Sequence, residues 1–64
     1  MNIQPMEKLH KKRIEKGWSQ VELAKRSGIT NVSIFNYEKG LRFPRRDVLY
    51  KLAEALECEV SDII

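Results

Sequence analysis

Three glycines divide the chain into segments that are each about as long as one short helix. Gly17, Gly28 and Gly40 stand 11 and 12 residues apart in a chain of 64 residues. Glycine is the usual residue just past a helix end, because it adopts the left-handed backbone conformation without steric cost. The chain has neither an alternating β-branched run nor an Asn-Gly or Asp-Gly turn, which would indicate strands. The spacing therefore predicts a single all-α domain over residues 1–64.

Capping residues mark where two of these helices begin. Ser19 and Glu22 have the spacing of a capping box, in which the serine hydroxyl and the glutamate carboxylate each accept a backbone N–H. Trp18 before this cap and Leu23 after it form a hydrophobic staple. The same arrangement recurs 11 residues later, at Ile29, Thr30 and Ile34. Two starts so close together predict two short helices joined by a tight turn at Gly28.

A further amphipathic helix follows towards the end of the chain. Leu49, Leu52, Ala53 and Leu56 recur at i, i+3, i+4 and i+7, the spacing of one helix face. Near the start of the chain, Pro5 can occupy the first position of a helix, where its missing N–H is no loss. The predicted helices span residues 5–16, 20–27, 31–38 and 46–56, and a final turn at 61–64 forms a fifth.

The composition is that of a small globular domain, with 42% apolar and 33% charged residues. The one cysteine cannot form an intramolecular disulfide, so helix packing must stabilise the fold. No apolar run exceeds three residues, so neither a membrane helix nor a secretory signal is predicted, and the expected location is the cytoplasm. Metal-ligand spacing and a Gly-rich phosphate loop are absent, so no enzyme, metal site or cofactor is predicted. We expect Cys58 to be buried. We expect His10 to be a solvated helix residue, which could lie near a phosphate.

Residues 20–39 carry the features of a helix-turn-helix motif. The small Ala24 allows the two short helices to cross closely, Gly28 makes the turn, and the apolar residues lock the helices at a fixed angle. Here the chain resembles the phage-repressor or Cro-like helix-turn-helix family, also called the XRE family. The resemblance extends through residues 17–24, 28–30 and 37–40, Arg42, Pro44 and residues 49–56, and so covers about residues 9–64. It implies a compact five-helix domain whose third helix lies in the major groove of double-stranded DNA.

One face of the predicted third helix is suited to reading DNA bases. Positions 31, 32, 35, 36 and 39 share this face, whereas Ile34 and Tyr37 form the opposite, packed face. Asparagine can bond adenine through two hydrogen bonds, and apolar groups can pack on thymine methyl groups. Asn31 and Lys39 could instead bind phosphate, and the alternative for the whole face is an ordinary solvated helix surface. The predicted base contacts are Asn31, Val32, Phe35 and Asn36.

Further residues are expected at the DNA backbone. The resemblance implies a phosphate contact from Gln20, which opens the second predicted helix, and a backbone contact from Arg42 in the loop after the third. Arg45 and Arg46 stand at the start of the fourth helix, where the helix dipole disfavours cations. This cost suggests that they bind the DNA backbone or acidic groups of a partner subunit. The predicted backbone contacts are Gln20, Thr30, Lys39, Arg42, Arg45 and Arg46.

Two charged residues fall at inward-facing positions of the predicted helices. The inward stripe of the first helix passes through Met6 and Leu9 and continues at i+4 to Arg13. On the third helix, Ile34 continues at i+4 to Glu38. We therefore predict a structural ion pair between Arg13 and Glu38, and the resemblance supports it, since related repressors pair these positions. The alternative is two independent surface charges.

Some positions depart from the family pattern or leave two interpretations open. Lys12 stands where many members have leucine, and Leu41 where many have lysine. Glu57 replaces a frequent glycine after the fourth helix, which is therefore expected to lack its usual cap. Trp18 is expected to be part of the core. Phe43 either covers the core or borders a dimer contact.

The leading hypothesis is a sequence-specific DNA-binding regulator, a repressor that binds a palindromic operator as a homodimer. The alternatives are an antitoxin or a restriction-modification controller of the same fold, and a protein-interaction module that does not bind DNA. Residues 1–17, 18–44 and 45–64 carry net charges of +3, +2 and −2, which add up to the +3 of the whole chain. A basic first two-thirds favours a polyanionic partner, although most charge runs are simply solvated. No small-molecule ligand is expected.

Overall fold

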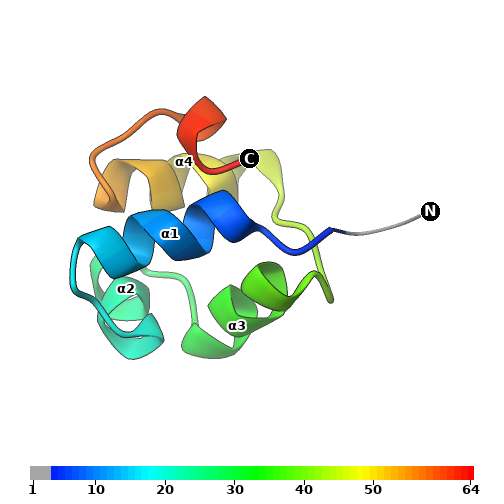
Figure 1. Ribbon diagram of the computed structural model, residues 1–64, viewed down its shortest axis with the longest axis horizontal. Coiled ribbons are helices and arrows are strands. Elements are labelled where there is room, and N and C mark those ends of the chain that lie inside the picture. The colour runs from blue at the N-terminus through cyan, green and yellow to red at the C-terminus, as the bar shows by residue number, and fades with distance from the viewer. Residues whose placement is uncertain (1–3) are drawn as a thin grey trace.

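Four α-helices and one short 3-10 helix make up the computed structural model, which describes residues 4–64 (Figure 1). The helices are α1 (Glu7–Glu15), α2 (Gln20–Ser27), α3 (Asn31–Lys39) and α4 (Arg46–Ala55), and the 3-10 helix is η1 (Val60–Asp62). The described residues contain no strand, so the fold is all-α, as predicted. None of these helices is long and apolar enough to cross a membrane.

The final turn expected at residues 61–64 is the 3-10 helix η1, so the prediction of a fifth helix is not confirmed beyond this single turn. The N–H groups of Asp62 and Ile63 reach back three residues, to the carbonyls of Glu59 and Val60. The Asp62 carboxylate also accepts the N–H of Glu59 at 2.9 Å. The backbone bonds that reach back three residues are those of a 3-10 helix, and the side-chain bond caps its start.

Helix α1 begins two residues later than the sequence predicts, at Glu7 rather than Pro5. The N–H of Met6 donates to the carbonyl of Tyr37 in α3 at 3.2 Å, and Met6 takes a non-helical conformation with φ −84° and ψ 78°. Residues 4 and 5 then cross the end of α3 so closely that a Cβ on Gly40 would lie 2.7 Å from the nitrogen of Pro5. Contact with α3 thus overrides the preference of proline for the first helical position.

The starts of α2 and α3 lie where the capping residues place them. The Ser19 hydroxyl accepts the N–H of Glu22 at 3.0 Å, and the Thr30 hydroxyl accepts the N–H of Ser33 at 3.2 Å. The capping box of α2 is only half formed. Its glutamate carboxylate instead accepts a bond from the Nε of Arg26, one turn further along, at 2.7 Å. The guanidinium of Arg26, one turn away, therefore replaces the backbone N–H as the hydrogen-bond donor to the Glu22 carboxylate.

The turn between α2 and α3 is made by Gly28, whose φ of +77° lies in the left-handed region. Its N–H closes α2 by donating to the carbonyl of Ala24 at 2.9 Å. Thr30, two residues further on, is already the cap of α3. The helix-turn-helix predicted at residues 20–39 is therefore present.

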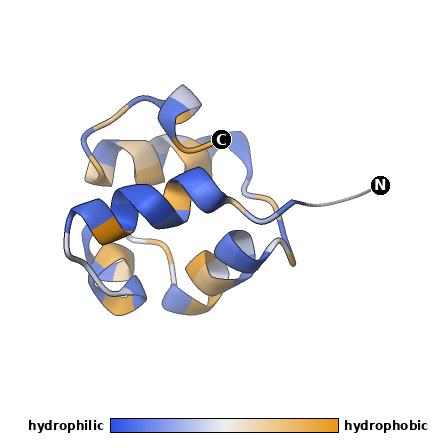
Figure 2. Ribbon diagram, viewed as in Figure 1, coloured by the Kyte–Doolittle hydropathy of each residue, from blue (hydrophilic) through white to orange (hydrophobic). Residues whose placement is uncertain are grey.

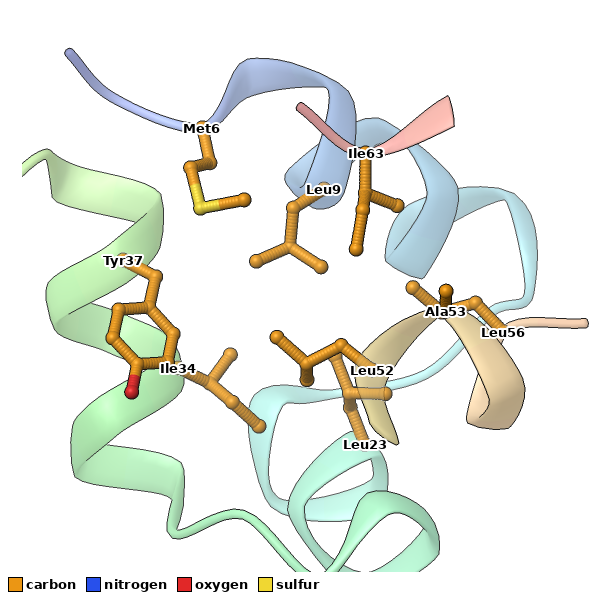
Figure 3. Packing of buried hydrophobic residues seen from close by; sticks show 9 residues of the cluster. All are labelled: Met6, Leu9, Leu23, Ile34, Tyr37, Leu52, Ala53, Leu56 and Ile63. Atoms are coloured by element: carbon orange, nitrogen blue, oxygen red, sulfur yellow. The ribbon is translucent and has the colours of Figure 1, made fainter. Parts of the chain in front are cut away.

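The core is a cluster of apolar side chains to which all four α-helices and the residues after η1 contribute (Figure 3). Five of them are fully enclosed: Leu9, Leu23, Ile34, Leu52 and Ile63. Burying one such side chain stabilises the fold by about 1.5–3 kcal/mol. Figure 2 shows that α1 is hydrophilic along most of its length, so this helix presents only a narrow apolar stripe. Helix α3 is anchored to the core through Ile34 and Tyr37, which leaves its opposite face to solvent.

Helix α4 ends at a residue with an unfavourable backbone conformation. Glu57 has φ +57°, and among residues 4–64 it is the one non-glycine residue with a positive φ. Its N–H donates to the carbonyl of Glu54 at 3.1 Å, and the N–H of Cys58 donates to the carbonyl of Ala53 at 3.0 Å. These two bonds form a Schellman cap. The expectation of a missing cap is therefore wrong, because the glutamate adopts the left-handed conformation itself, at a steric cost that glycine avoids.

Three candidate core residues are less enclosed than a core position requires. Trp18 is partly buried against the cluster, and the guanidinium of Arg26 lies 4.3 Å from its ring centroid. Cys58 is also only partly buried, although this burial raises the pKa of its thiol. Phe43 is 54% exposed, so it does not cover the core.

Candidate nucleic-acid interface

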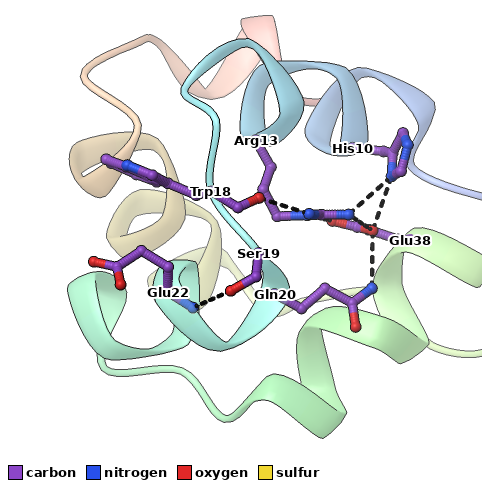
Figure 4. Close-up of polar contacts among 7 residues, drawn as sticks. All are labelled: His10, Arg13, Trp18, Ser19, Gln20, Glu22 and Glu38. Atoms are coloured by element: carbon purple, nitrogen blue, oxygen red, sulfur yellow. Dashed lines mark hydrogen bonds and ion pairs between the residues drawn. The ribbon is translucent and has the colours of Figure 1, made fainter.

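The side of α3 that faces α1 carries a buried ion pair (Figure 4). The Nε of Arg13 donates to Oε2 of Glu38 at 2.7 Å, and Nη2 donates to Oε1 at 3.0 Å. The two side chains are only 8% and 4% exposed. Nη1 of the same guanidinium donates to the carbonyl of Trp18 at 2.8 Å. The pair predicted from the sequence is thus formed in the structure, and it ties α1 to α3 and to the loop before α2.

Two more side chains reach the same carboxylate. Nε2 of Gln20 donates to Oε1 of Glu38 at 3.1 Å. Nδ1 of His10 lies 3.0 Å from that oxygen and 3.2 Å from Nη2 of Arg13, although 54% of the histidine side chain remains exposed. We refer to His10, Arg13, Gln20 and Glu38 as the polar cluster. It draws together residues from α1, α2 and α3.

The polar cluster differs from the sequence-based expectation at two residues. His10 is not simply a solvated helix residue, since it contacts both members of the ion pair. The signal that could have placed it is its position three residues before Arg13, on the same face of α1. Gln20, expected at a DNA phosphate, donates within the domain to Glu38. This amide can therefore contact a phosphate either through its second hydrogen or after its bond to Glu38 is broken.

The polar cluster keeps Glu38 ionised. Burial by itself would raise the pKa of this carboxyl. Hydrogen bonds from Arg13, His10 and Gln20, together with the charge of Arg13, outweigh burial and lower the pKa of Glu38 below its ordinary value. A carboxylate on the inner side of α3 thus accepts donors from both α1 and α2, and these bonds fix the position of α3 against the two helices.

The opposite side of α3 is open to solvent. Val32 and Phe35 are 63% and 42% exposed, and Asn36 is partly buried. The ammonium of Lys39 lies 5.9 Å from the centroid of the Phe35 ring, so the cation covers one edge of this apolar surface. We refer to this side as the outer face of α3; it consists of Asn31, Val32, Phe35, Asn36 and Lys39. It presents amide and apolar groups side by side, the groups that base edges can bind.

The N-terminal end of α3 is exposed at its cap. The Thr30 hydroxyl accepts the N–H of Ser33 and donates to the Ser33 hydroxyl at 2.9 Å. Both hydroxyls therefore take part in closing the first turn, and the Thr30 oxygen retains capacity to accept a further bond. The predicted backbone contact thus coincides with the helix cap.

The segment after α3 carries three arginines. Arg42 lies in the loop, Arg45 is the N-terminal cap of α4 and Arg46 is the first residue of that helix. All three are exposed, and none lies within ion-pair distance of a carboxylate in residues 4–64. Their charges therefore add to the positive potential of this segment, where Asp47 is the acidic residue in the first turn of α4.

A profile of the helix-turn-helix family matches residues 9–63, which is most of the chain. The chain belongs to the XRE-type helix-turn-helix family. None of the curated proteins matches it. Among solved structures, the restriction-modification controller protein C.AhdI from Aeromonas hydrophila shares 33% sequence identity with this XRE-type domain, with a TM-score of 0.86. That match covers 91% of this chain and 88% of C.AhdI.

An HTH_3 family transcriptional regulator from Vibrio cholerae is also similar to this XRE-type domain. It shares 26% identity over 95% of this chain, with a TM-score of 0.87, and the matched part is 34% of that protein. XRE-type helix-turn-helix domains bind DNA and regulate transcription, and their proteins are typically not enzymes. In the XRE-type domain described here, the polar cluster holds the inner side of α3 and the outer face of the helix remains accessible.

Proposed function

We propose that this domain is a sequence-specific transcriptional repressor that acts in the cytoplasm and inserts α3 into the major groove of double-stranded DNA. The observation that carries this proposal is the two-sided character of α3. Ile34 and Glu38 are buried on its inner side, whereas Val32 and Phe35 are exposed on its outer face. The major groove is about 12 Å wide and admits an α-helix. A helix held on one side by the core and the polar cluster presents its other side in a fixed orientation to base edges.

The outer face supplies the proposed base contacts. The amide of Asn36 offers one acceptor and two donors, which match the N7 and N6 groups of adenine. Val32 and Phe35 stand next to it on the helix and can pack on thymine methyl groups. Asn31 opens the helix and offers the same amide chemistry one turn earlier. The proposed base contacts are Asn31, Val32, Phe35 and Asn36.

Residues around this face supply the proposed backbone contacts. An arginine binds a phosphate through two parallel hydrogen bonds, and such contacts fix the register of a protein on the duplex without reading its sequence. The exposed arginines after α3 are suited to this role because none of them forms an ion pair with a carboxylate among residues 4–64. The proposed backbone contacts are Gln20, Thr30, Lys39, Arg42, Arg45 and Arg46.

We further propose that the domain binds as a homodimer on a palindromic operator. The molecule measures 31 × 21 × 20 Å, so two copies in contact along the longest axis have centres about 31 Å apart. Successive major grooves on one side of DNA recur about every 34 Å. Leu41 and Phe43, 61% and 54% exposed, give the loop after α3 an apolar surface that a second copy would cover.

Selection of bound sequences from random duplex DNA tests the proposed function. The expected result is an enriched palindrome whose half-sites lie about one helical turn apart. Enrichment of a single unrepeated half-site would contradict the homodimer. A pool without any enriched motif would refute sequence-specific binding and would favour a protein-interaction module.

A restriction-modification controller is the second candidate, favoured by the 33% identity to C.AhdI over 91% of this chain. Such a controller is expected to act on its own gene. Footprinting of the DNA upstream of this chain's coding sequence, combined with a reporter fused to that promoter, tests the candidate. Protection of that region together with a change in reporter expression would support it, and an unprotected upstream region would contradict it.

A further inference from the structure

One oxygen of the polar cluster is approached by three donors. Oε1 of Glu38 lies 3.0 Å from Nη2 of Arg13, 3.1 Å from Nε2 of Gln20 and 3.0 Å from Nδ1 of His10. A carboxylate oxygen offers about two lone-pair sites. Oε2 accepts only Nε of Arg13, at 2.7 Å, whereas the other three donors all lie at Oε1. The three groups therefore compete for two good positions.

His10 also faces two neighbours with opposite requirements. Its Nδ1 must carry a hydrogen to bind Oε1 of Glu38, but must lack one to accept a bond from Nη2 of Arg13, 3.2 Å away. The neutral imidazole with its hydrogen on Nε2 can accept from Arg13 and leave Oε1 to the other two donors. The imidazolium can only donate, and its charged bond to a carboxylate is stronger than the bond from a neutral amide.

We propose that His10 is a positioning residue that decides whether the amide of Gln20 is held by Glu38 or released towards a DNA phosphate. The proposal rests on the proposed function, because it concerns the phosphate contact assigned to Gln20. When His10 is neutral, Oε1 accepts from Arg13 and Gln20. When His10 takes up a proton, it displaces the weakest of the three donors, which is the neutral amide of Gln20.

The released amide lies where a phosphate can use it. Gln20 is the first residue of α2, and the first N–H groups of a helix, together with its dipole, attract phosphate. Once His10 is charged, Glu38 no longer accepts a hydrogen bond from this amide, which is then free to bind phosphate. Proton uptake by His10 therefore strengthens DNA binding, although His10 itself touches no DNA.

The surroundings of His10 make the effect attributable to this one side chain. The groups that face it are Arg13 on its own helix, Glu38 on α3 and the uncharged Gln20 on α2. Glu7 stands one turn earlier on α1. The sequence holds a single histidine, and histidine is the side chain that ordinarily changes charge between about pH 5 and 8.

The first test uses the DNA-free chain, so that its outcome does not depend on the proposed function. The side-chain amide resonances of Gln20 are followed by NMR from about pH 8 to pH 5.5, in the native chain and in His10→Asn. Asparagine places an amide near the position of Nδ1, so it can donate to Glu38 but cannot gain a proton. We expect a titration of the Gln20 amide in the native chain and none in His10→Asn. A Gln20 amide that does not respond to pH in the native chain would overturn the proposal.

The second test measures affinity for the selected operator at about pH 8 and pH 5.5, each over a range of salt concentrations. Native affinity should rise about threefold to tenfold at the lower pH, the worth of one hydrogen bond. The salt slope should stay unchanged, because the gained contact is uncharged. The rise should disappear in His10→Asn and equally in Gln20→Ala, which keeps the histidine.

The Gln20→Ala variant separates this mechanism from a direct contact. If the rise persists in that variant and the salt slope steepens by about 1 at the lower pH, then His10 binds phosphate itself and the positioning role is wrong. Absence of DNA binding by the native chain at both pH values would refute the proposed function and with it the DNA part of this inference. The amide titration decides the coupling between His10 and Gln20 in either case.

Discussion

Replacing Arg13 with alanine should destabilise this domain strongly, because the substitution leaves the charge of Glu38 buried without its main partner. The guanidinium supplies bonds of 2.7 and 3.0 Å to a side chain that is only 4% exposed. Breaking a buried pair in this way costs about 3–5 kcal/mol. Because Gln20 still donates to the carboxylate, we expect the lower end, about 3 kcal/mol. A domain of this size loses about 4–8 °C of melting midpoint per kcal/mol, which gives a fall of about 12–24 °C.

Thermal and urea unfolding at neutral pH measure this loss, and Lys12→Ala is the matched control on the same helix. Lys12 forms an exposed pair with Glu15 at 3.8 Å, so its removal should cost about 0.5 kcal/mol or less. Equal midpoints for the native chain and Arg13→Ala would refute the claim that the Arg13–Glu38 pair carries stability.

The pH dependence of unfolding gives an independent check on the same reasoning. The pKa of Glu38 is lowered in the folded state, so its stabilising contribution is complete above its unfolded-state pKa. That contribution is lost as the pH falls through the lower folded-state pKa. Arg13→Ala removes the guanidinium's bonds and charge, which lower the pKa of Glu38, so the stability difference between the two chains should shrink on acidification. A stability difference between the two chains that does not shrink towards acidic pH would contradict a stranded charge.

Three further predictions concern the outer face, the backbone contacts and the end of α4. Asn36→Ala should lose about 1–3 kcal/mol of binding on the selected operator and little on scrambled duplexes, and equal losses on both would exclude base reading. The double variant Arg45→Ala, Arg46→Ala should weaken all sequences alike and reduce the salt slope by about 1 per lost contact, whereas an unchanged slope would exclude phosphate contact. Glu57→Gly should raise the melting midpoint by about 4–8 °C because it removes the left-handed strain, while Glu57→Ala, which keeps φ positive, should not.

Local signals made the helix-turn-helix predictable from the sequence. The predicted bounds of 20–27 and 31–38 agree with Gln20–Ser27 and Asn31–Lys39 to within one residue. Cap hydroxyls and left-handed glycines act over three or four residues, so they can be recognised along the chain. The start of α1 could not be predicted in this way. It depends on a bond from Met6 to Tyr37, which is 31 positions away in the sequence.

The contacts of the candidate site were predictable where the periodicity of single helices specifies them. They were not predictable where side chains from three helices meet. The Arg13–Glu38 pair follows from two inward stripes, each read along its own helix. The place of Gln20 depends on the direction its side chain takes from the first turn of α2 towards α1 and α3, and helical spacing does not specify that direction. The sequence likewise favoured a capping box for Glu22, but it did not indicate that Arg26 would claim the carboxylate.

The buried pair constrains α3 in a way that apolar packing alone does not. Helix α3 has nine residues, and only Ile34 and Tyr37 anchor it to the apolar core. Apolar contacts are non-directional, so two such anchors constrain the rotation of a helix about its own axis only weakly. The two parallel bonds between Arg13 and Glu38 are directional, because the planar guanidinium fork matches a carboxylate in one orientation. A helix that reads bases must present the same side chains to the groove each time it docks. Under the proposed function, the pair therefore contributes to DNA recognition by fixing the rotation of α3.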